Sequence, residues 1–289
     1  MKFSIIGGDM RQAWLAKHLA DDGNSVAVFG LDAEDGSAAI RRAESVSDAV
    51  KNSEYVILPL PAADGEGNIN APMFDGKIPA EEVLDAVTQS QTVFAGRIEG
   101  MLENAVKKRG LRAIDYFARE ELAVKNAGAT AEGAVQILLE EMPTVLTGAR
   151  VLVVGFGRIG KLLSMKLRAM GADVTVSARR FSDFAWIEEM GYRSADTRRL
   201  AGNAGKFDAI VNTVPAGVID DRVLEHVRKD CLMLDLASKP GGIDFDAAAR
   251  RGIKVIWALS LPGKVAPETS GMAIRDTIYN IVKELECAD

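Results

Sequence analysis

The stretch Val151-Leu-Val-Val-Gly-Phe-Gly-Arg-Ile-Gly160 decides the fold of this chain. An apolar strand runs into the pattern Gly-x-Gly-x-x-Gly, and a helix-like run over residues 161–170 follows. In such a turn Gly155 makes the tight bend, Gly157 lets the backbone approach a pyrophosphate, and Gly160 lets helix and strand pack closely. The free N–H groups of the helix N-terminus then face the phosphates. The stretch therefore predicts a dinucleotide-binding turn.

The residues after this turn support the prediction. Gly171-Ala-Asp-Val-Thr-Val176 supplies a second strand at the expected distance and completes a βαβ unit. A glycine-rich turn without a ligand is the alternative, because such turns also occur in structural loops.

The end of the second strand indicates which dinucleotide is bound. NAD-binding units usually place Asp or Glu there, whereas this chain has Ser177-Ala-Arg-Arg180, with Ala178 in the acidic position. Arg179 or Arg180 would bind a 2′-phosphate through charge-assisted hydrogen bonds, and Ser177 would add a hydroxyl donor. NADP is therefore favoured over NAD. The alternative is that both arginines are solvated charges at the start of the next helix.

Composition bounds the possible classes of protein. The chain has 289 residues, of which 48% are hydrophobic, enough for two domains with separate cores. A net charge of −6 argues against nucleic acid or an anionic membrane as partner. Cys231 and Cys287 have no metal-ligand spacing, so we expect free thiols in a reducing cytoplasm and no metal site. The sequence shows neither a membrane span nor a signal peptide.

Strand-like and helix-like runs alternate along the whole chain, which is typical of parallel sheets covered on both faces. The predicted strands are residues 3–6, 25–29, 55–58, 92–95, 112–115, 151–154, 173–176, 209–211, 231–236 and 254–257. The predicted fold class is α/β, with two doubly wound Rossmann-like domains separated by a cleft and joined by crossing helices. Residues 1–120 with the C-terminal helix 268–289 form a substrate domain, and residues 121–267 form an NADP-binding domain.

The first domain also begins with a strand, a glycine turn and a helix. Asp9 and Gln12 replace the second and third glycines, so a carboxylate and a bulky side chain lie where a pyrophosphate would need space. We expect this turn not to bind a dinucleotide, although Asp9, Arg11 and Gln12 could contact a smaller ligand.

Two further segments belong to the predicted cleft. Residues 58–79 form a long irregular stretch, which is either a lid or binding loop or a solvated insertion. Residues 119–142 are predicted to be mostly helical, with a break near residues 126–130 and a new helix start at Thr130.

Several segments together resemble a known family. Asn212-Thr-Val-Pro215, Asp235-Leu-Ala-Ser-Lys-Pro-Gly-Gly242 and the residues 259–270 have the character of a nicotinamide site. With Gly7-Gly-Asp-Met-Arg-Gln12, residues 58–66 and residues 126–134, this set resembles the dipicolinate synthase A-subunit family over essentially the whole chain. The layout is more distantly similar to alanine dehydrogenase and S-adenosylhomocysteine hydrolase.

The resemblance implies a chemistry, a partner and a location. The chemistry is oxidation of dihydrodipicolinate or 4-hydroxy-tetrahydrodipicolinate to dipicolinate with NADP, in the cytoplasm of the mother cell of a sporulating bacterium. The partner is the flavoprotein-like B subunit of dipicolinate synthase, and self-association stays open. Because the product is aromatic, positioning of ring and cofactor matters more than a strong general base. This suits a chain whose two histidines, His18 and His226, are expected to be packing or surface residues.

The candidate site residues fall into three groups. Arg11, Gln12, Arg119, Thr130 and Ser260 are the candidates for substrate binding, and Lys264 and Lys125 are the candidates for catalysis. The cofactor candidates are Gly155, Phe156, Gly157, Arg158, Ile159, Gly160, Ser177, Ala178, Arg179, Arg180, Asn212, Thr213, Val214, Pro215, Ala237 and Ser238.

Two other functions remain open. The chain could be a cofactor-binding partner subunit without catalytic activity, because no unmistakable catalytic residue is visible. It could also be an oxidoreductase of the alanine dehydrogenase type, although an acidic residue at position 178 and a Lys–His pair are missing. A 2-hydroxyacid dehydrogenase is disfavoured, because no histidine follows His226.

Overall fold

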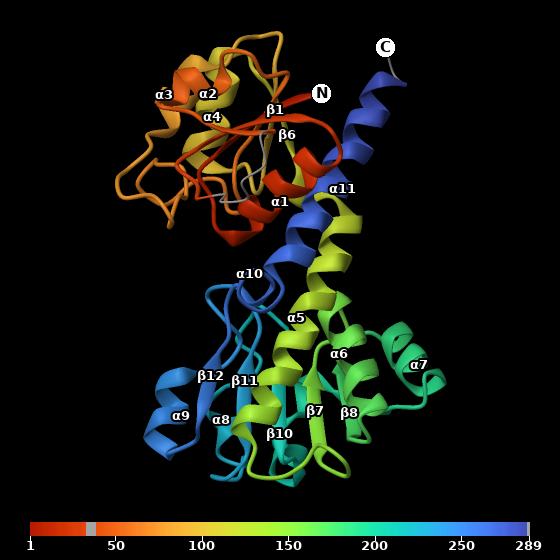
Figure 1. The fold of residues 1–289 in the computed structure, drawn as a ribbon. Coiled ribbons are helices and arrows are strands. Elements are labelled where there is room, and N and C mark those ends of the chain that lie inside the picture. Colours follow the sequence, from red (N-terminus) through yellow and green to blue (C-terminus); the bar gives the residue numbers. More distant parts are fainter. Residues whose placement is uncertain (33–38, 288–289) are drawn as a thin grey trace. The chain divides into compact units, whose positions relative to one another are not determined.

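The chain divides into two compact units in the computed structural model, which describes residues 1–32 and 39–287. The first unit comprises Met1–Asn126 and Ala266–Asp289, and the second comprises Ala127–Val265. Residues 288–289 of the predicted C-terminal segment lie outside the described residues. Each unit is built on its own sheet (Figure 1).

The sheet of the first unit has six parallel strands in the order β3-β2-β1-β4-β5-β6. The strands are β1 (Lys2–Ile6), β2 (Ser25–Phe29), β3 (Ile40–Arg42), β4 (Tyr55–Ile57), β5 (Thr92–Ala95) and β6 (Arg112–Asp115). Apolar residues of the central strands are buried on both faces, as a parallel sheet between two helical layers requires.

Helices cover both faces of this sheet. They are α1 (Met10–Asp21), α2 (Val46–Val50), α3 (Ala80–Ala86), α4 (Gly100–Arg109), the 3₁₀ turn η1 (Tyr116–Ala118), the start of α5 (Glu120–Glu141) and α11 (Pro267–Glu286). One core joins Phe3 and Ile5 to α1 and α11, and the other joins Ile6 and Val56 to α2, α3 and α4. Helix α11 approaches α1 closely, because a Cβ at Gly271 would lie 2.7 Å from the Arg11 carbonyl oxygen.

The second unit repeats this arrangement with the sheet order β12-β11-β10-β7-β8-β9. Its parallel strands are β7 (Arg150–Val154), β8 (Asp173–Ala178), β9 (Arg193–Asp196), β10 (Ala209–Asn212), β11 (Leu232–Asp235) and β12 (Val255–Trp257). In both sheets the strand order reverses beside the first strand, between β1 and β4 and between β7 and β10. Open α/β sheets bind ligands outside the carboxyl ends of the strands at such a point.

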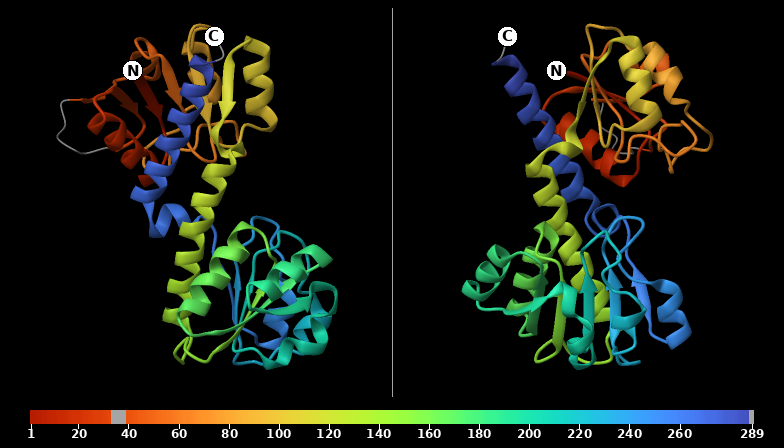
Figure 2. Two further views of the ribbon diagram at one scale, coloured as in Figure 1. Left: turned by 90° about the vertical axis from the view of Figure 1, so that its right-hand side faces the viewer. Right: turned by 180° about the vertical axis from the view of Figure 1, so that it is seen from behind.

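The helices of the second unit also form two layers (Figure 2). Val151 and Val153 face α5, α6 (Arg158–Ala169), α7 (Phe181–Glu189) and α10 (Leu261–Val265). Leu152 and Val154 face η3 (Ala201–Lys206), α8 (Asp221–Leu224) and α9 (Phe245–Arg251). The remaining element is the 3₁₀ turn η2 (Thr197–Arg199). The predicted α/β class with two doubly wound units is confirmed.

Two strands were absent from the sequence-based prediction. β3 and β9 lie at sheet edges, are three and four residues long, and carry exposed Arg41, Arg42 and Arg193. Short charged edge strands lack the apolar run that identifies a buried strand. Pairing with a neighbouring strand, rather than their own composition, therefore fixes them.

The predicted break near residues 126–130 is wrong, because α5 runs without interruption from Glu120 to Glu141. A glycine inside a helix costs only about 1 kcal/mol relative to alanine. Burial of Ala127, Ala131, Ala134 and Leu138 outweighs this cost.

Of the helices that the structure describes, none is both long and apolar enough to cross a membrane.

Candidate functional site

The glycine turn after β7 has the predicted geometry. Gly155 has a φ of 104°, and a Cβ there would lie 2.5 Å from Thr213 Oγ1. A Cβ at Gly160 would lie 2.1 Å from the Gly155 carbonyl oxygen, so helix and strand pack too closely for any side chain. A Cβ at Gly157, in contrast, would meet no atom of the described residues within 4 Å apart from its two chain neighbours. The second glycine of the pattern thus faces open space at the switch point of the sheet.

Helix α6 begins at this open space. Its N-cap is Gly157, which provides no side-chain cap, and the first turn contains no acidic residue. The first N–H groups of a helix need partners, and they carry the positive end of the helix dipole. The arrangement fits the phosphates of a dinucleotide.

Two arginines follow β8 at the same edge of the sheet. Arg179 and Arg180 are both exposed, and Arg180 is the N-cap of α7. Within the described part of the chain, neither guanidinium forms an ion pair or a hydrogen bond. Position 178, where NAD-binding units place an acidic residue, is a buried alanine. It therefore carries no carboxylate that could compete for these cations.

Ser177 requires a correction. Its side chain is fully buried, and its Oγ accepts a hydrogen bond of 3.0 Å from the Thr197 hydroxyl. Side chains alternate between the two faces of a strand, so the hydroxyl lies in the core rather than at the strand end. The predicted contact of this hydroxyl with a 2′-phosphate is therefore wrong.

Asn212 and Asp235 form a buried polar pair at the ends of β10 and β11. Asn212 Nδ2 donates to Asp235 Oδ1 at 2.8 Å and to the Val214 carbonyl at 3.0 Å. The carboxylate also accepts from the backbone N–H groups of Ala237 and Gly242 at 3.0 and 2.8 Å. The Asn212 side chain, predicted to contact the cofactor, instead fixes the two loops that follow these strands.

The remaining nicotinamide candidates lie on these loops. Thr213 Oγ1 donates to the Val154 carbonyl at 2.9 Å, and the Ala237 carbonyl accepts from Trp257 Nε1 at 2.9 Å. Val214 is half-buried beside Gly155, whereas Pro215 and Ser238 are exposed. The loops bring these residues to the carboxyl edge of the sheet near the glycine turn.

Ser260 and Lys264 lie at the end of β12, on the same edge. Ser260 is exposed and has a φ of 59°, a left-handed conformation that is rare for residues with a Cβ. Lys264 is exposed on α10, and its ammonium group has no ion pair among the described residues. Thr130 is buried on α5.

The corresponding glycine turn of the first unit is closed. A Cβ at Gly7 would lie 2.9 Å from Ile69 Cγ2, and the Gly8 N–H donates to the Asn70 carbonyl at 2.9 Å. Asp9 caps α1, and Gln12 completes a capping box with it. The segment 58–79 therefore covers the place that a pyrophosphate would occupy, consistent with our expectation for this turn.

Gln12 and Tyr116 are buried beneath that segment. Gln12 Oε1 accepts from the Asp9 N–H at 3.2 Å, whereas its Nε2 has no hydrogen-bond partner in the described part of the chain. The Tyr116 hydroxyl donates to the Leu58 carbonyl at 2.9 Å, and burial raises the pKa of Tyr116 far above its ordinary value. Both side chains lie inside the core rather than at an open surface.

The predicted cationic ligands of the first unit have protein partners. Arg11 is largely buried, binds both carboxylate oxygens of Asp9 and donates to the Leu60 carbonyl. Arg119 donates to Glu284 at 2.6 and 2.7 Å, which raises the pKa of Arg119 above its ordinary value.

Lys125 has a partner of the same kind, because it pairs with Asp276 at 2.7 Å. Arg119 and Lys125 thus tie the chain before and in α5 to α11, which differs from the predicted role in substrate binding and catalysis. Sequence patterns alone could not reveal partners more than 150 positions away.

Sequence reasoning missed Arg97, which lies two residues after the end of β5. It has a φ of 68°, and its N–H donates to Asp115 Oδ1 at 2.9 Å. Its side chain lines a pocket of about 680 Å³ together with residues of the segment 58–79. The available signal was its position two residues after a predicted strand, between Gly96 and Gly100.

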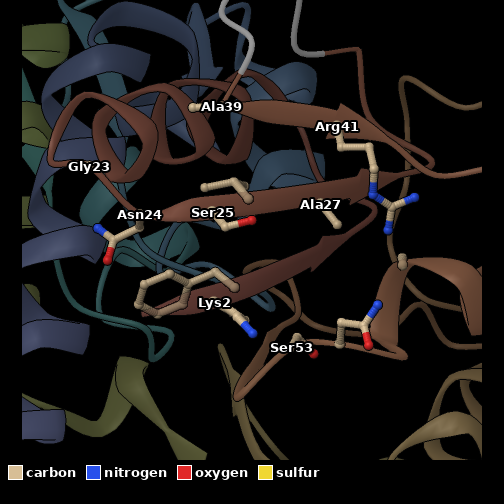
Figure 3. Close-up of a pocket in the computed structure, with 12 residues that line it drawn as sticks. Lys2, Gly23, Asn24, Ser25, Ala27, Ala39, Arg41 and Ser53 are labelled. Carbon is tan, nitrogen blue, oxygen red and sulfur yellow. The ribbon is translucent and has the colours of Figure 1, made fainter.

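A second pocket of about 610 Å³ lies at the opposite edge of the first sheet (Figure 3). Lys2 and Ser25, at the amino ends of β1 and β2, line it together with Arg41 and Ser53. Arg41 is paired with Asp48 at 2.6 Å. The pocket lies at the amino ends of the strands, whereas the switch point of the first sheet lies at their carboxyl ends.

The histidines and cysteines contribute little to these edges. His18 lies in the last turn of α1 and stacks on Trp14, with ring centroids 5.9 Å apart. His226 is exposed, and its Nδ1 lies 3.0 Å from the Arg222 carbonyl. Both cysteines are free thiols, and burial raises the pKa of Cys231 to about 12.

Two family models match separate parts of the chain. Residues 2–117 match the N-terminal domain of the dipicolinate synthase A subunit. Residues 129–238 match the NAD-binding domain of D-isomer specific 2-hydroxyacid dehydrogenases. A crystal structure of the dipicolinate synthase A subunit from Bacillus halodurans is 30% identical, with 97% of each chain covered and a TM-score of 0.89. The chain belongs to the dipicolinate synthase A-subunit family.

Two further relatives of this family come from Bacillus subtilis. The crystal structure of the dipicolinate synthase A chain is 29% identical, covers 100% of this chain and 98% of that chain, and has a TM-score of 0.90. The curated dipicolinate synthase A subunit of strain 168 is 29% identical over 100% of this chain and 98% of its own length. The resemblance found in the sequence is therefore confirmed. The match of residues 129–238 supports an oxidoreductase with a nicotinamide cofactor.

Proposed function

We propose that this chain is the NADP-dependent oxidoreductase subunit of a dipicolinate synthase. Its substrate is dihydrodipicolinate, or 4-hydroxy-tetrahydrodipicolinate that first loses water to give dihydrodipicolinate. The observation that carries the proposal is the pairing of a dinucleotide turn facing open space with a full-length match to the dipicolinate synthase A subunit. Fold alone would not suffice, because one fold hosts many activities.

The residues of the second unit fit the cofactor. The uncapped start of α6 offers N–H groups to the pyrophosphate, and Gly157 leaves the necessary space. Arg179 and Arg180 have no protein partner among the described residues and suit a 2′-phosphate. The loops fixed by Asn212 and Asp235 supply the wall for the nicotinamide. When bound, NADP supplies a hydride acceptor.

The substrate chemistry requires few special groups. Dihydrodipicolinate loses one hydride and one proton to become the aromatic pyridine-2,6-dicarboxylate, and aromaticity drives the reaction forward. The protein mainly has to hold two carboxylates and exclude water. In the second unit, the ammonium group of Lys264 is exposed and has no ion pair among the described residues. We assign it to a substrate carboxylate.

A second subunit completes the proposed enzyme. The names of the relatives describe one subunit of a synthase, so we propose the B subunit of dipicolinate synthase as partner of this chain. Turnover measured with the isolated chain, and then in the presence of the B subunit, tests whether the hydride transfer belongs to this chain.

Arg179→Ala is expected to weaken NADP binding about tenfold or more and to leave NAD binding nearly unchanged. Only NADP loses a charge-assisted contact with the 2′-phosphate, which contributes about 1.5–3 kcal/mol. Calorimetric titration with both dinucleotides measures the difference. Arg250→Ala, which removes an exposed cation from α9, is the control. Equal losses for both dinucleotides would remove Arg179 from the site and make Arg180 the next candidate.

Lys264→Ala is expected to lower turnover at least tenfold while NADP affinity stays within about twofold. A substrate carboxylate without its cation in a desolvated site loses about 1–3 kcal/mol of interaction. Steady-state kinetics and NADP titration of the same preparation check this. Lys254→Ala is the matched control, because Lys254 pairs with Glu141 next to the amino end of β12. Unchanged kinetics of Lys264→Ala would show that Lys264 is a solvated surface charge outside the site.

A further inference from the structure

We propose that Arg97 binds a carboxylate of the cyclic substrate in the pocket of the first unit. This inference rests on the proposed function, because it assumes a dicarboxylate ligand. Three observations carry it: the backbone conformation of Arg97, the weak engagement of its guanidinium, and the pocket that it lines.

The backbone of Arg97 is in a strained conformation. Arg97 and Ser260 are the two non-glycine residues with positive φ in the described part of the chain. Each follows a strand at the carboxyl edge of its sheet, Arg97 after β5 and Ser260 after β12. Residues with a Cβ avoid this region, and such strain clusters at functional sites. Glycine would relieve the strain, so the presence of an arginine at this position indicates a function for its side chain.

Asp115 holds this conformation in place. Its carboxylate accepts hydrogen bonds from the N–H groups of Arg97 at 2.9 Å, Ile98 at 3.0 Å and Phe117 at 2.8 Å. Three donors on one carboxylate fix the turn after β5 relative to the end of β6. The turn therefore presents Arg97 from a rigid base, as a binding site requires.

The guanidinium of Arg97 is available to a ligand. Its one ion pair in the described structure joins Nε to Glu99 Oε1 at 2.8 Å, with side chains that are 57% and 63% exposed. Exposed pairs of this kind contribute little and exchange readily. Arg11, in contrast, is buried against Asp9, and Arg119 binds both oxygens of Glu284. Of these three arginines, Arg97 has the weakest interactions with the rest of the protein.

The pocket has the size and the position for a small ligand. Its volume of about 680 Å³ falls within the range of small-molecule sites. Besides Glu99, the carboxylates of Asp64, Glu66 and Glu81 line it. Asp64 accepts two backbone N–H groups, and Glu66 pairs with Lys77, so both carboxylates have partners other than Arg97.

Glu99 is therefore the direct competitor of a ligand carboxylate for Arg97. It is also the N-cap of α4, which begins beside the pocket without a side-chain cap. The pair Arg97–Glu99 gives opposite expectations for the two residues. Removing the cation should weaken binding, and removing the competing carboxylate should strengthen it.

Calorimetric titration of the full chain with dipicolinate tests the inference. We expect Arg97→Gln and Arg97→Gly to weaken dipicolinate binding about tenfold or more, since a charge-assisted contact is lost. Glu99→Gln should tighten it severalfold. Arg97→Gly relieves the positive φ, so its thermal midpoint should equal or exceed that of the unmodified chain, which excludes unfolding as the cause.

Arg112→Gln is the control, because it removes an exposed cation at the amino end of β6. Dipicolinate affinity of Arg97→Gly within about twofold of the unmodified chain would overturn the inference, and so would an unmodified chain that does not bind dipicolinate. NADP titrations of the same proteins separate the two claims. Failure of the unmodified chain to bind NADP would contradict the proposed function alone, because the effect of Arg97 is measured without cofactor.

Discussion

Gly157→Val is expected to abolish dinucleotide binding and to leave the second unit folded. Apart from its own chain neighbours, no atom of the described residues lies within 4 Å of the position that a Cβ would take, so a valine side chain fits the protein itself. It would occupy the space beside the N-terminus of α6 that the pyrophosphate needs. Steric exclusion of this kind costs about 3 kcal/mol or more, which is about a hundredfold in affinity. Titration with NADP and circular dichroism of the variant measure both parts.

Gly202→Val provides the matched control. Gly202 also has open space at its Cβ, but it lies in η3, away from the glycine turn in the sequence. This variant should bind NADP with unchanged affinity. A folded Gly157→Val protein that binds NADP normally would show that the cofactor lies elsewhere.

Gly160→Ala is expected to destabilise the second unit by about 3 kcal/mol or more. The added Cβ would lie 2.1 Å from the Gly155 carbonyl oxygen, a rigid backbone atom at the end of β7. Helix α6 would have to move away from the strand, which disrupts the packing of Leu163 and Leu167 in the core. Denaturant unfolding measures the loss, and Gly202→Ala is the control.

The two glycine substitutions thus separate the ligand from the fold. Gly157→Val should affect binding and not stability, whereas Gly160→Ala should affect stability first. A Gly160→Ala protein as stable as the unmodified chain would contradict the close packing of α6 on β7.

The sequence predicted the parts of the fold that burial dictates. Ten strands were predicted from their strand-like runs, and β2, β5 and β6 have the predicted bounds. The edge strands β3 and β9 were not predicted, since sheet pairing and not hydrophobicity defines them. The break in α5 was wrongly predicted because local propensity at Gly128 and Thr130 is weaker than tertiary packing.

The sequence predicted the candidate site best at the positions that require a glycine. Gly155, Gly157 and Gly160 have geometric roles that a sequence pattern records directly. The partners of polar side chains were not predictable, because they come from distant segments. Ser177 is buried against Thr197, and Asn212 is bound to Asp235. The left-handed backbone of Arg97 likewise depends on Asp115, which lies 18 residues further along the chain.

Oxidation of a freshly prepared solution of 4-hydroxy-tetrahydrodipicolinate by the purified chain tests the central claim most directly. Formation of reduced dinucleotide is followed by its absorbance, and dipicolinate is identified by mass, with NADP and NAD compared in the presence and absence of the B subunit. We predict that the chain forms dipicolinate and reduced dinucleotide in equal amounts, faster with NADP than with NAD. Reduction of neither dinucleotide, whether or not the B subunit is present, would contradict the account.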